Sequence, residues 1–261
     1  MHPLDFPFKS VHHKQRSLRH FRAVLFDMDG VVTDTANVHA AAWKALFDEA
    51  MAVLDPKQPP FDAADDYRLY VDGRPREAGV RSFLESRGLV IPEGSDEDPA
   101  GAMTVHGLAS QKQMYFEQAL SQQGVLLVEP TIELIRQLRA EYVPLALVTS
   151  SRNGPQVLEA GGVLDLFDVI VDGNTALQLH LPGKPDPATY LEASRLLGVD
   201  PADSVVIEDA ASGVQAGRDG GYAWVVGLNR HAGQSDELLK NAGADVVVDS
   251  LDKLDRVNRT T

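Results

Sequence analysis

Residues 23–34 read AVLFDMDGVVTD. The first four of these residues form a continuous apolar run, which is typical of a strand buried on both faces of a parallel sheet. Asp27 and Asp29 follow directly, at the strand end where open α/β sheets bind their ligands. This stretch therefore predicts a parallel sheet whose first strand delivers two carboxylates to the carboxyl edge.

Apolar runs of strand length recur later in the chain, and helical stretches separate most of them. These runs cover residues 145–148, 169–171, 205–207, 223–226 and 246–248. One intervening helix is predicted by Asp186-Pro187, an N-cap acceptor followed by a proline in the first turn, and it runs to Gly198. Such alternation predicts an α/β fold, a doubly wound parallel sheet with a Rossmann-like core.

The segment between the first two predicted strands has helical periodicity and no strong strand signal. We predict that residues 37–128 form an inserted helical cap domain, and that residues 21–36 and 129–261 form the α/β core. Residues 1–20 show no clear period. We predict that they form an N-terminal extension, either poorly ordered or serving as a docking arm.

The composition excludes several classes of function. The 261 residues carry a formal net charge of -14, which disfavours broad contact with nucleic acid or with an anionic membrane. Any anionic substrate must therefore be captured locally, by a metal or by lysine and arginine side chains. The absence of cysteine excludes disulfides and thiolate chemistry. Because the apolar runs are also too short to span a membrane, we expect a cytoplasmic monomer that acts on a small molecule.

Polar residues also follow two other predicted strands. Glu208-Asp209 is a second acidic pair at a strand end, and Thr149 follows another strand. Neighbouring ionised carboxylates repel one another, so the site needs a divalent cation or a shared proton, and Mg²⁺ suits an all-oxygen site. Lys184, in an intervening loop, could neutralise a phosphoryl oxygen or a carboxylate. The simpler alternatives are a solvated surface lysine and, for Asp27 and Asp29, a role as turn formers.

These residues resemble the four motifs of the haloacid dehalogenase-like hydrolase superfamily, in the same order, from about Phe21 to Leu251. The resemblance implies that Asp27 is a nucleophile that carries a phosphoryl group and that Asp29 is the general acid and base. Thr35 is then hypothesised to hold the Asp29 carboxyl out of line until the cap closes. The resemblance also implies the remaining roles: Thr149 and Lys184 would hold the phosphoryl group, and Asp27, the Asp29 carbonyl, Glu208 and Asp209 would bind Mg²⁺.

The region after the first motif is similar to a subgroup of this superfamily, the β-phosphoglucomutases. The likeness rests on residues 34–39, on Trp43 and on the loop at residues 70–76. Asp72 departs from the basic residue that is common in that loop. The likeness implies the following substrate-binding residues: Thr35, His39, Trp43, Gly73, Arg76, Lys112, Ser150, Ser151 and Asn153.

Several of these residues have two interpretations. His39 would reach a sugar hydroxyl or the carboxyl of Asp29, or else it is an exposed residue on a helix that packs through a tryptophan. Arg76 and Lys112 would bind the phosphate that is not transferred, although Lys112 could also be an exposed helix lysine. Asn153 would meet the sugar phosphate, or serve only as a helix N-cap.

The resemblance implies an enzyme that interconverts β-D-glucose 1-phosphate and D-glucose 6-phosphate through an aspartyl phosphate and β-glucose 1,6-bisphosphate. Such a mutase needs one phosphate pocket at Asp27 and a second on the cap, so this interpretation depends on Arg76 and Lys112. A magnesium-dependent sugar-phosphate phosphatase needs only the first pocket and is the alternative. A non-catalytic binding protein on the same fold is a third hypothesis, against which the presence of all four motifs argues.

Overall fold

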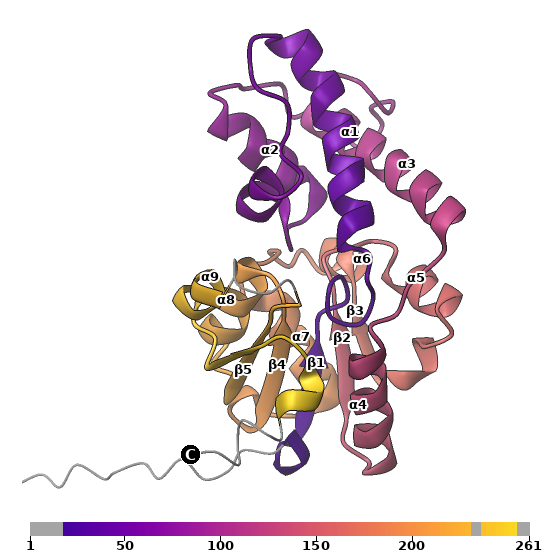
Figure 1. Cartoon of the computed structure of the whole chain (residues 1–261), viewed down its shortest axis with the longest axis vertical. Helices are drawn as coiled ribbons and strands as arrows, with labels where there is room; N and C mark the ends of the chain where they lie inside the picture. Colours follow the sequence, from indigo (N-terminus) through magenta and orange to yellow (C-terminus); the bar gives the residue numbers. More distant parts are fainter. Residues whose placement is uncertain (1–17, 231–235, 255–261) are drawn as a thin grey trace, which may run out of the picture.

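A parallel sheet lies at the centre of the computed structural model, which describes residues 18–230 and 236–254 (Figure 1). Within these residues the sheet has six strands in the order β3-β2-β1-β4-β5-β6, and all neighbouring pairs are parallel. The predicted doubly wound sheet is therefore confirmed. The strands are β1 (Ala23–Phe26), β2 (Leu145–Val148), β3 (Val169–Val171), β4 (Ser204–Glu208), β5 (Trp224–Leu228) and β6 (Val246–Val248).

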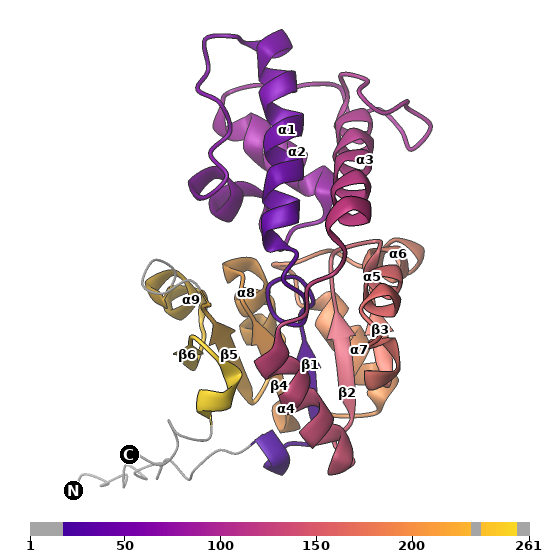
Figure 2. The same cartoon turned by 45° about the vertical axis from the view of Figure 1, so that its right-hand side comes forward.

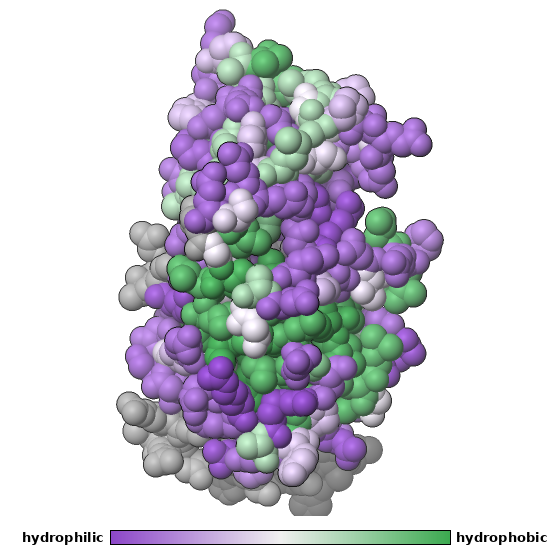
Figure 3. Space-filling model, turned by 90° about the vertical axis from the view of Figure 1, so that its right-hand side faces the viewer, coloured by the Kyte–Doolittle hydropathy of each residue, from purple (hydrophilic) through white to green (hydrophobic). Residues whose placement is uncertain are grey.

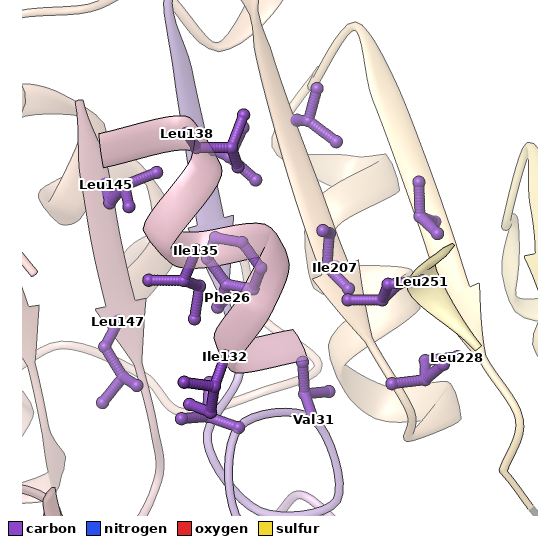
Figure 4. Close-up of a cluster of buried hydrophobic side chains, with 14 of the residues drawn as sticks. Phe26, Val31, Ile132, Ile135, Leu138, Leu145, Leu147, Ile207, Leu228 and Leu251 are labelled. Carbon is purple, nitrogen blue, oxygen red and sulfur yellow. The ribbon is translucent and has the colours of Figure 1, made fainter. Parts of the chain in front are cut away.

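Helices cover both faces of the sheet, because successive strand residues point to opposite faces. Val24 and Phe26 belong to one buried cluster, whereas Ala23 and Leu25 belong to another. Figure 4 shows side chains of helix α4, among them Ile135, lying over Phe26 in the first cluster. The first face carries α4 (Glu129–Ala140) and α5 (Gly154–Ala160), and the second carries α7 (Ala188–Leu197), α8 (Ala211–Asp219) and α9 (Asp236–Ala242).

The strand register places the polar strand ends at one level. Phe26 of β1 pairs with Leu147 of β2 on one side and with Ile207 of β4 on the other. The residues that follow these strands therefore meet at the same edge of the sheet. Strand order reverses between β1 and β4, which is where doubly wound sheets bind ligands.

The predicted helix at residues 186–198 is present as α7. The backbone amide of Ala188, the first residue of this helix, donates to Asp186 Oδ1 at 2.9 Å. At the other end, Gly198 follows the helix in the left-handed conformation, with φ of 68°. Near the N-terminus, Leu18–His20 form a short 3-10 turn in which Leu18 is buried against the core. The rest of the predicted N-terminal extension, residues 1–17, lies outside the described residues.

Three long helices lie beyond the carboxyl edge of the sheet, at the top of Figures 1 and 2. They are α1 (Ala36–Leu54), α2 (Arg76–Ser86) and α3 (Val105–Gln123). A π-helical turn, η2 (Tyr67–Val71), lies between α1 and α2. A separate aromatic cluster holds them together, in which Phe47 and Phe83 lie 4.1 Å apart between ring centroids. The short helix α6 (Gly173–Gln178) follows β3. The cap boundaries at residues 37 and 128 remain a prediction.

The surface mixes polar and apolar areas. Figure 3 shows apolar residues gathered over the middle of one face, below a more polar helical region. Extended apolar areas are common at contact surfaces, so the monomeric state also remains a prediction. In the part of the chain that the structure describes, the helices all lack the combination of length and apolar character needed to cross a bilayer.

Candidate active site

Lys184 lies at the centre of the polar strand ends. Its Nζ donates to Asp27 Oδ1 at 2.5 Å, to Glu208 Oε1 at 2.6 Å and to the Val148 carbonyl at 3.1 Å. Each of the three ammonium protons therefore has an acceptor, and Lys184 is only 3% exposed. The alternative of a solvated surface lysine is wrong. Because Lys184 binds Oδ1, the second oxygen of Asp27 is left for other chemistry.

An acidic cluster beside this lysine can hold a metal ion. Oxygen atoms of Asp27, Glu208 and Asp209 all lie within 4.8 Å of one another. Two glycines leave room for these carboxylates: a Cβ at Gly30 would lie 1.6 Å from Asp209 Oδ2, and one at Gly213 would lie 1.6 Å from Glu208 Oε1. The donor set is entirely oxygen, which fits Mg²⁺.

The charges in this cluster are not balanced. Burial raises the pKa of Asp27 well above its usual value, and Glu208 adds to this effect while Lys184 opposes it. Burial also raises the pKa of Asp209, with Asp72 and Asp27 adding to it. Burial alone would lower the pKa of Lys184, but the carboxylates of Asp27 and Glu208 raise it. A divalent cation would relieve this excess of negative charge.

Asp29 is held by groups from the cap side of the site. The Thr35 hydroxyl donates to Asp29 Oδ1, and His39 Nε2 lies 3.3 Å from the same oxygen. Burial would raise the pKa of Asp29, but His39, Thr35 and Lys112 together lower it. The contact expected between Thr35 and Asp29 is therefore present, and it favours the ionised carboxylate.

His39 connects Asp29 to Lys112. Lys112 Nζ lies 2.6 Å from His39 Nδ1, and the His39 ring stacks on Phe116 at 4.1 Å between centroids. Burial, and then Lys112, lower the pKa of His39, so the ring is neutral. In a neutral ring whose Nδ1 accepts from a lysine, Nε2 carries the proton. Nε2 lies close to Asp29 Oδ1 but does not have hydrogen-bond geometry to it. The exposed-residue interpretation of His39 is wrong, since its side chain is only 13% exposed.

The cap presents two cations to the pocket. Lys112 is only 4% exposed, with its Nζ 5.1 Å from the centroid of the Trp43 ring, so it is not an exposed helix lysine. Burial and the neighbouring Arg76 lower its pKa to about 7. Arg76 is half-buried, and its guanidinium has no hydrogen bond or ion pair within residues 18–230 and 236–254. Two cations that lack full compensation are typical of a site that binds an anion.

One pocket joins the strand ends to these cap cations. Four of the expected site residues are not among the described residues that line this pocket: Thr35, Asn153, Lys184 and Glu208. Asn153 stands at the N-terminus of α5 without a side-chain cap hydrogen bond. The expected residues that do line the pocket are Asp27, Asp29, His39, Trp43, Gly73, Arg76, Lys112, Thr149, Ser150, Ser151 and Asp209.

The structure adds lining residues that were not among the expected substrate-binding residues. Tyr67 and Asp72 both line the pocket. Burial, with Glu208 adding to it, raises the pKa of Asp72 to about 7. The lining also includes Val71, Arg74 and Gln113.

Polar contacts fasten the cap to the core at the pocket rim. Ser150 Oγ donates to the Gly73 carbonyl at 2.9 Å, so these two expected substrate residues also bind each other. Ser212 Oγ donates to the Asp72 carbonyl at 3.1 Å, and Arg152 pairs with Glu77 at 2.9 Å. The cap is therefore closed over the strand ends.

Known proteins are similar to this chain in sequence and in fold. A family model described as haloacid dehalogenase-like hydrolase matches residues 21–221. The β-phosphoglucomutase of Mycobacterium bovis is 45% identical over 239 residues, which cover 89% of this chain and 91% of that protein. A phosphorylated carbohydrates phosphatase of Thermotoga maritima is 30% identical and covers 87% of this chain and 93% of its own. A crystal structure of β-phosphoglucomutase from Clostridium difficile has a TM-score of 0.68 at 25% identity, covering 92% of this chain and 93% of that one.

Proposed function

Since the chain belongs to the haloacid dehalogenase-like hydrolase family, and is thus an enzyme of phosphotransferase or hydrolase type, we propose that it is a mutase of sugar phosphates. It interconverts β-D-glucose 1-phosphate and D-glucose 6-phosphate through an aspartyl phosphate and β-glucose 1,6-bisphosphate. One observation carries this proposal. A single pocket is lined both by Asp27 and by the cap cations Arg76 and Lys112, whose charges lack full compensation. A bisphosphorylated sugar has two anionic ends to match.

In the first half-reaction, Asp27 attacks the phosphorus of the bisphosphate. Lys184 holds Oδ1 of Asp27, so Oδ2 forms the new bond to phosphorus while the bond from phosphorus to the sugar oxygen breaks. Asp29 must be protonated for this step, although its surroundings favour the carboxylate. The proton that it gives to the departing sugar oxygen is regained in the second half-reaction. Mg²⁺ held by Asp27, Asp209, Glu208 and the Asp29 carbonyl would supply positive charge to the phosphoryl oxygens.

In the second half-reaction, the sugar phosphate presents its other hydroxyl to the phosphorylated Asp27. Asp29 takes the proton from that hydroxyl, the sugar oxygen bonds to phosphorus, and Asp27 is released. Thr35 binds one oxygen of Asp29, and His39 Nε2 lies 3.3 Å from the same oxygen, which leaves the other oxygen for this proton exchange. Arg76 and Lys112 hold the phosphate that does not react in both halves of the cycle.

The alternative is hydrolysis, in which water replaces the second hydroxyl. The similarity to a Thermotoga maritima phosphatase favours this candidate, and such an enzyme needs no cap cations. Phosphorus NMR separates the two. The protein is incubated with β-D-glucose 1-phosphate, Mg²⁺ and a trace of β-glucose 1,6-bisphosphate. We expect glucose 6-phosphate as the product. Stoichiometric inorganic phosphate would instead contradict the mutase hypothesis and support the phosphatase. Asp27→Asn should abolish both reactions and any phosphorylation of the protein.

A further inference from the structure

Tyr190 of helix α7 contacts two active-site groups from beneath the pocket. Its hydroxyl donates to Glu208 Oε1 at 2.9 Å, and Lys184 Nζ lies 4.9 Å from the centroid of its ring. The side chain is completely buried, at 0% exposure, so it cannot touch a substrate. Any effect of Tyr190 on the reaction must therefore pass through Glu208 or Lys184.

The two oxygens of Glu208 have different donors. Oε1 accepts from Lys184 and Tyr190, whereas Oε2 accepts from the amides of Asp209 and Ala210, both at 3.1 Å. The Oε2 contacts are longer and lie on the side of Asp209, the other acidic residue of this strand end. The shorter contacts to Oε1 therefore contribute most to fixing the orientation of this carboxylate, whose oxygens belong to the acidic cluster.

The ring of Tyr190 is held by the ring of Tyr222, which it meets edge to face with 6.0 Å between centroids. The Tyr222 hydroxyl donates to the backbone carbonyl of Tyr190 at 2.6 Å and lies 2.7 Å from Ser194 Oγ, so Tyr222→Phe would keep the ring contact. The Glu208 carboxylate lies directly against the Cα of Gly213, where a Cβ would come 1.6 Å from Oε1. Glycine has no side chain to orient the carboxylate on that side, so its hydrogen bonds do so.

We propose that Tyr190 is a positioning residue that orients Glu208 for Mg²⁺. Without the Tyr190 hydroxyl, Lys184 is the one remaining donor to Oε1 among the described residues. Together with the longer contacts from two amides to Oε2, it holds the carboxylate less firmly. An ordered ligand binds a metal more tightly than one that must first be oriented, because the loss of rotational freedom has already occurred. The inference deepens the proposed function, and it rests on that function only in that the acidic cluster binds a divalent cation.

Tyr190→Phe tests the proposal because it removes the hydroxyl and keeps the ring over Lys184. We expect Mg²⁺, titrated into the full chain without sugar phosphate in a calorimeter, to bind about tenfold more weakly, the low end for loss of such a contact. Tyr222→Phe is the matched control. It removes another buried tyrosine hydroxyl next to α7, but one without contact to a carboxylate. It should change Mg²⁺ affinity by less than about twofold, whatever its effect on melting temperature.

A double-mutant cycle with Glu208→Gln completes the test. If Tyr190 acts through Glu208, adding Tyr190→Phe to Glu208→Gln should weaken Mg²⁺ binding by less than about twofold further. Native affinity in Tyr190→Phe, equal losses in the two phenylalanine variants, or additive losses in the cycle would each overturn the proposal. The titration contains no sugar, so its result does not depend on whether the enzyme is a mutase or a phosphatase.

Discussion

Replacing Arg76 by alanine should separate the two candidate activities. The Arg76 guanidinium lines the pocket, and in the described part of the chain it has no partner of its own. It is therefore available to the phosphate that is not being transferred. A mutase must hold that phosphate in both half-reactions. Hydrolysis of a small phosphate ester at Asp27 makes no use of it.

The size of the effect follows from the contacts that Arg76 can make. A guanidinium binds phosphate through two charge-assisted hydrogen bonds, and bonds to charged groups contribute about 1.5–3 kcal/mol each. Because Lys112 remains at the same end of the pocket, we expect a loss of about 3 kcal/mol rather than the full sum. Since about 1.4 kcal/mol corresponds to a factor of ten, kcat/KM for the mutase should fall on the order of 100-fold.

Two assays on the same preparations measure this difference. The first follows glucose 6-phosphate formation from β-D-glucose 1-phosphate with a trace of the bisphosphate, and the second follows p-nitrophenyl phosphate hydrolysis. Arg81→Ala is the matched control, because Arg81 lies on the same helix α2 but pairs with Glu93 instead of facing the pocket. We expect Arg81→Ala to leave both rates within about twofold, as is usual for exposed ion pairs.

Two results would refute this reasoning. Equal losses in the two assays would mean that Arg76 supports the fold or the core site, not the distal phosphate. Unchanged mutase turnover would mean that the second phosphate binds elsewhere on the cap.

Three further perturbations test other parts of the site. Burial and a neighbouring arginine lower the pKa of Lys112 to about 7, and only its protonated form attracts phosphate, so KM for the sugar phosphate should rise as pH rises above 7. Lys112→Met should flatten that pH profile. A Cβ at position 213 would overlap Glu208, so Gly213→Ala should lower the melting temperature, because disturbing a buried ion pair costs about 3–5 kcal/mol. Thr35→Ala frees Asp29 and should raise hydrolysis relative to transfer; an unchanged ratio would end that hypothesis.

The sheet and its strand ends could be predicted because their signals are local. An apolar run followed directly by Asp27 predicts a buried strand whose carboxyl end is polar. Parallel strands share their carboxyl edge, so Thr149 and Glu208 could be expected beside it. The structure then adds what spacing cannot show, namely that Lys184 is fully buried with three acceptors.

The cap could be predicted less completely, because its contacts join distant segments. Ser150 and Gly73 are 77 residues apart, and Ser212 and Asp72 are 140 residues apart. No local sequence pattern predicts such pairs of contacting residues. The contact of Tyr190 with Glu208 could not be predicted either, since a tyrosine that only packs in the core and one that orients a carboxylate have the same helical periodicity.

Because the net charge of the protein is -14, the cap cations Arg76 and Lys112 are important for attracting an anionic substrate. The protein as a whole repels a sugar phosphate, so the attraction must come from groups close to the bound molecule. Burial and Arg76 disfavour the charge on Lys112, and burial and Arg152 disfavour the charge on Arg76, so both cations are destabilised in the absence of an anion. A phosphate bound between them would remove that repulsion and recover its free energy as affinity. Keeping two like charges together in a pocket, at a cost to folding, is expected only where an anion is part of the working state.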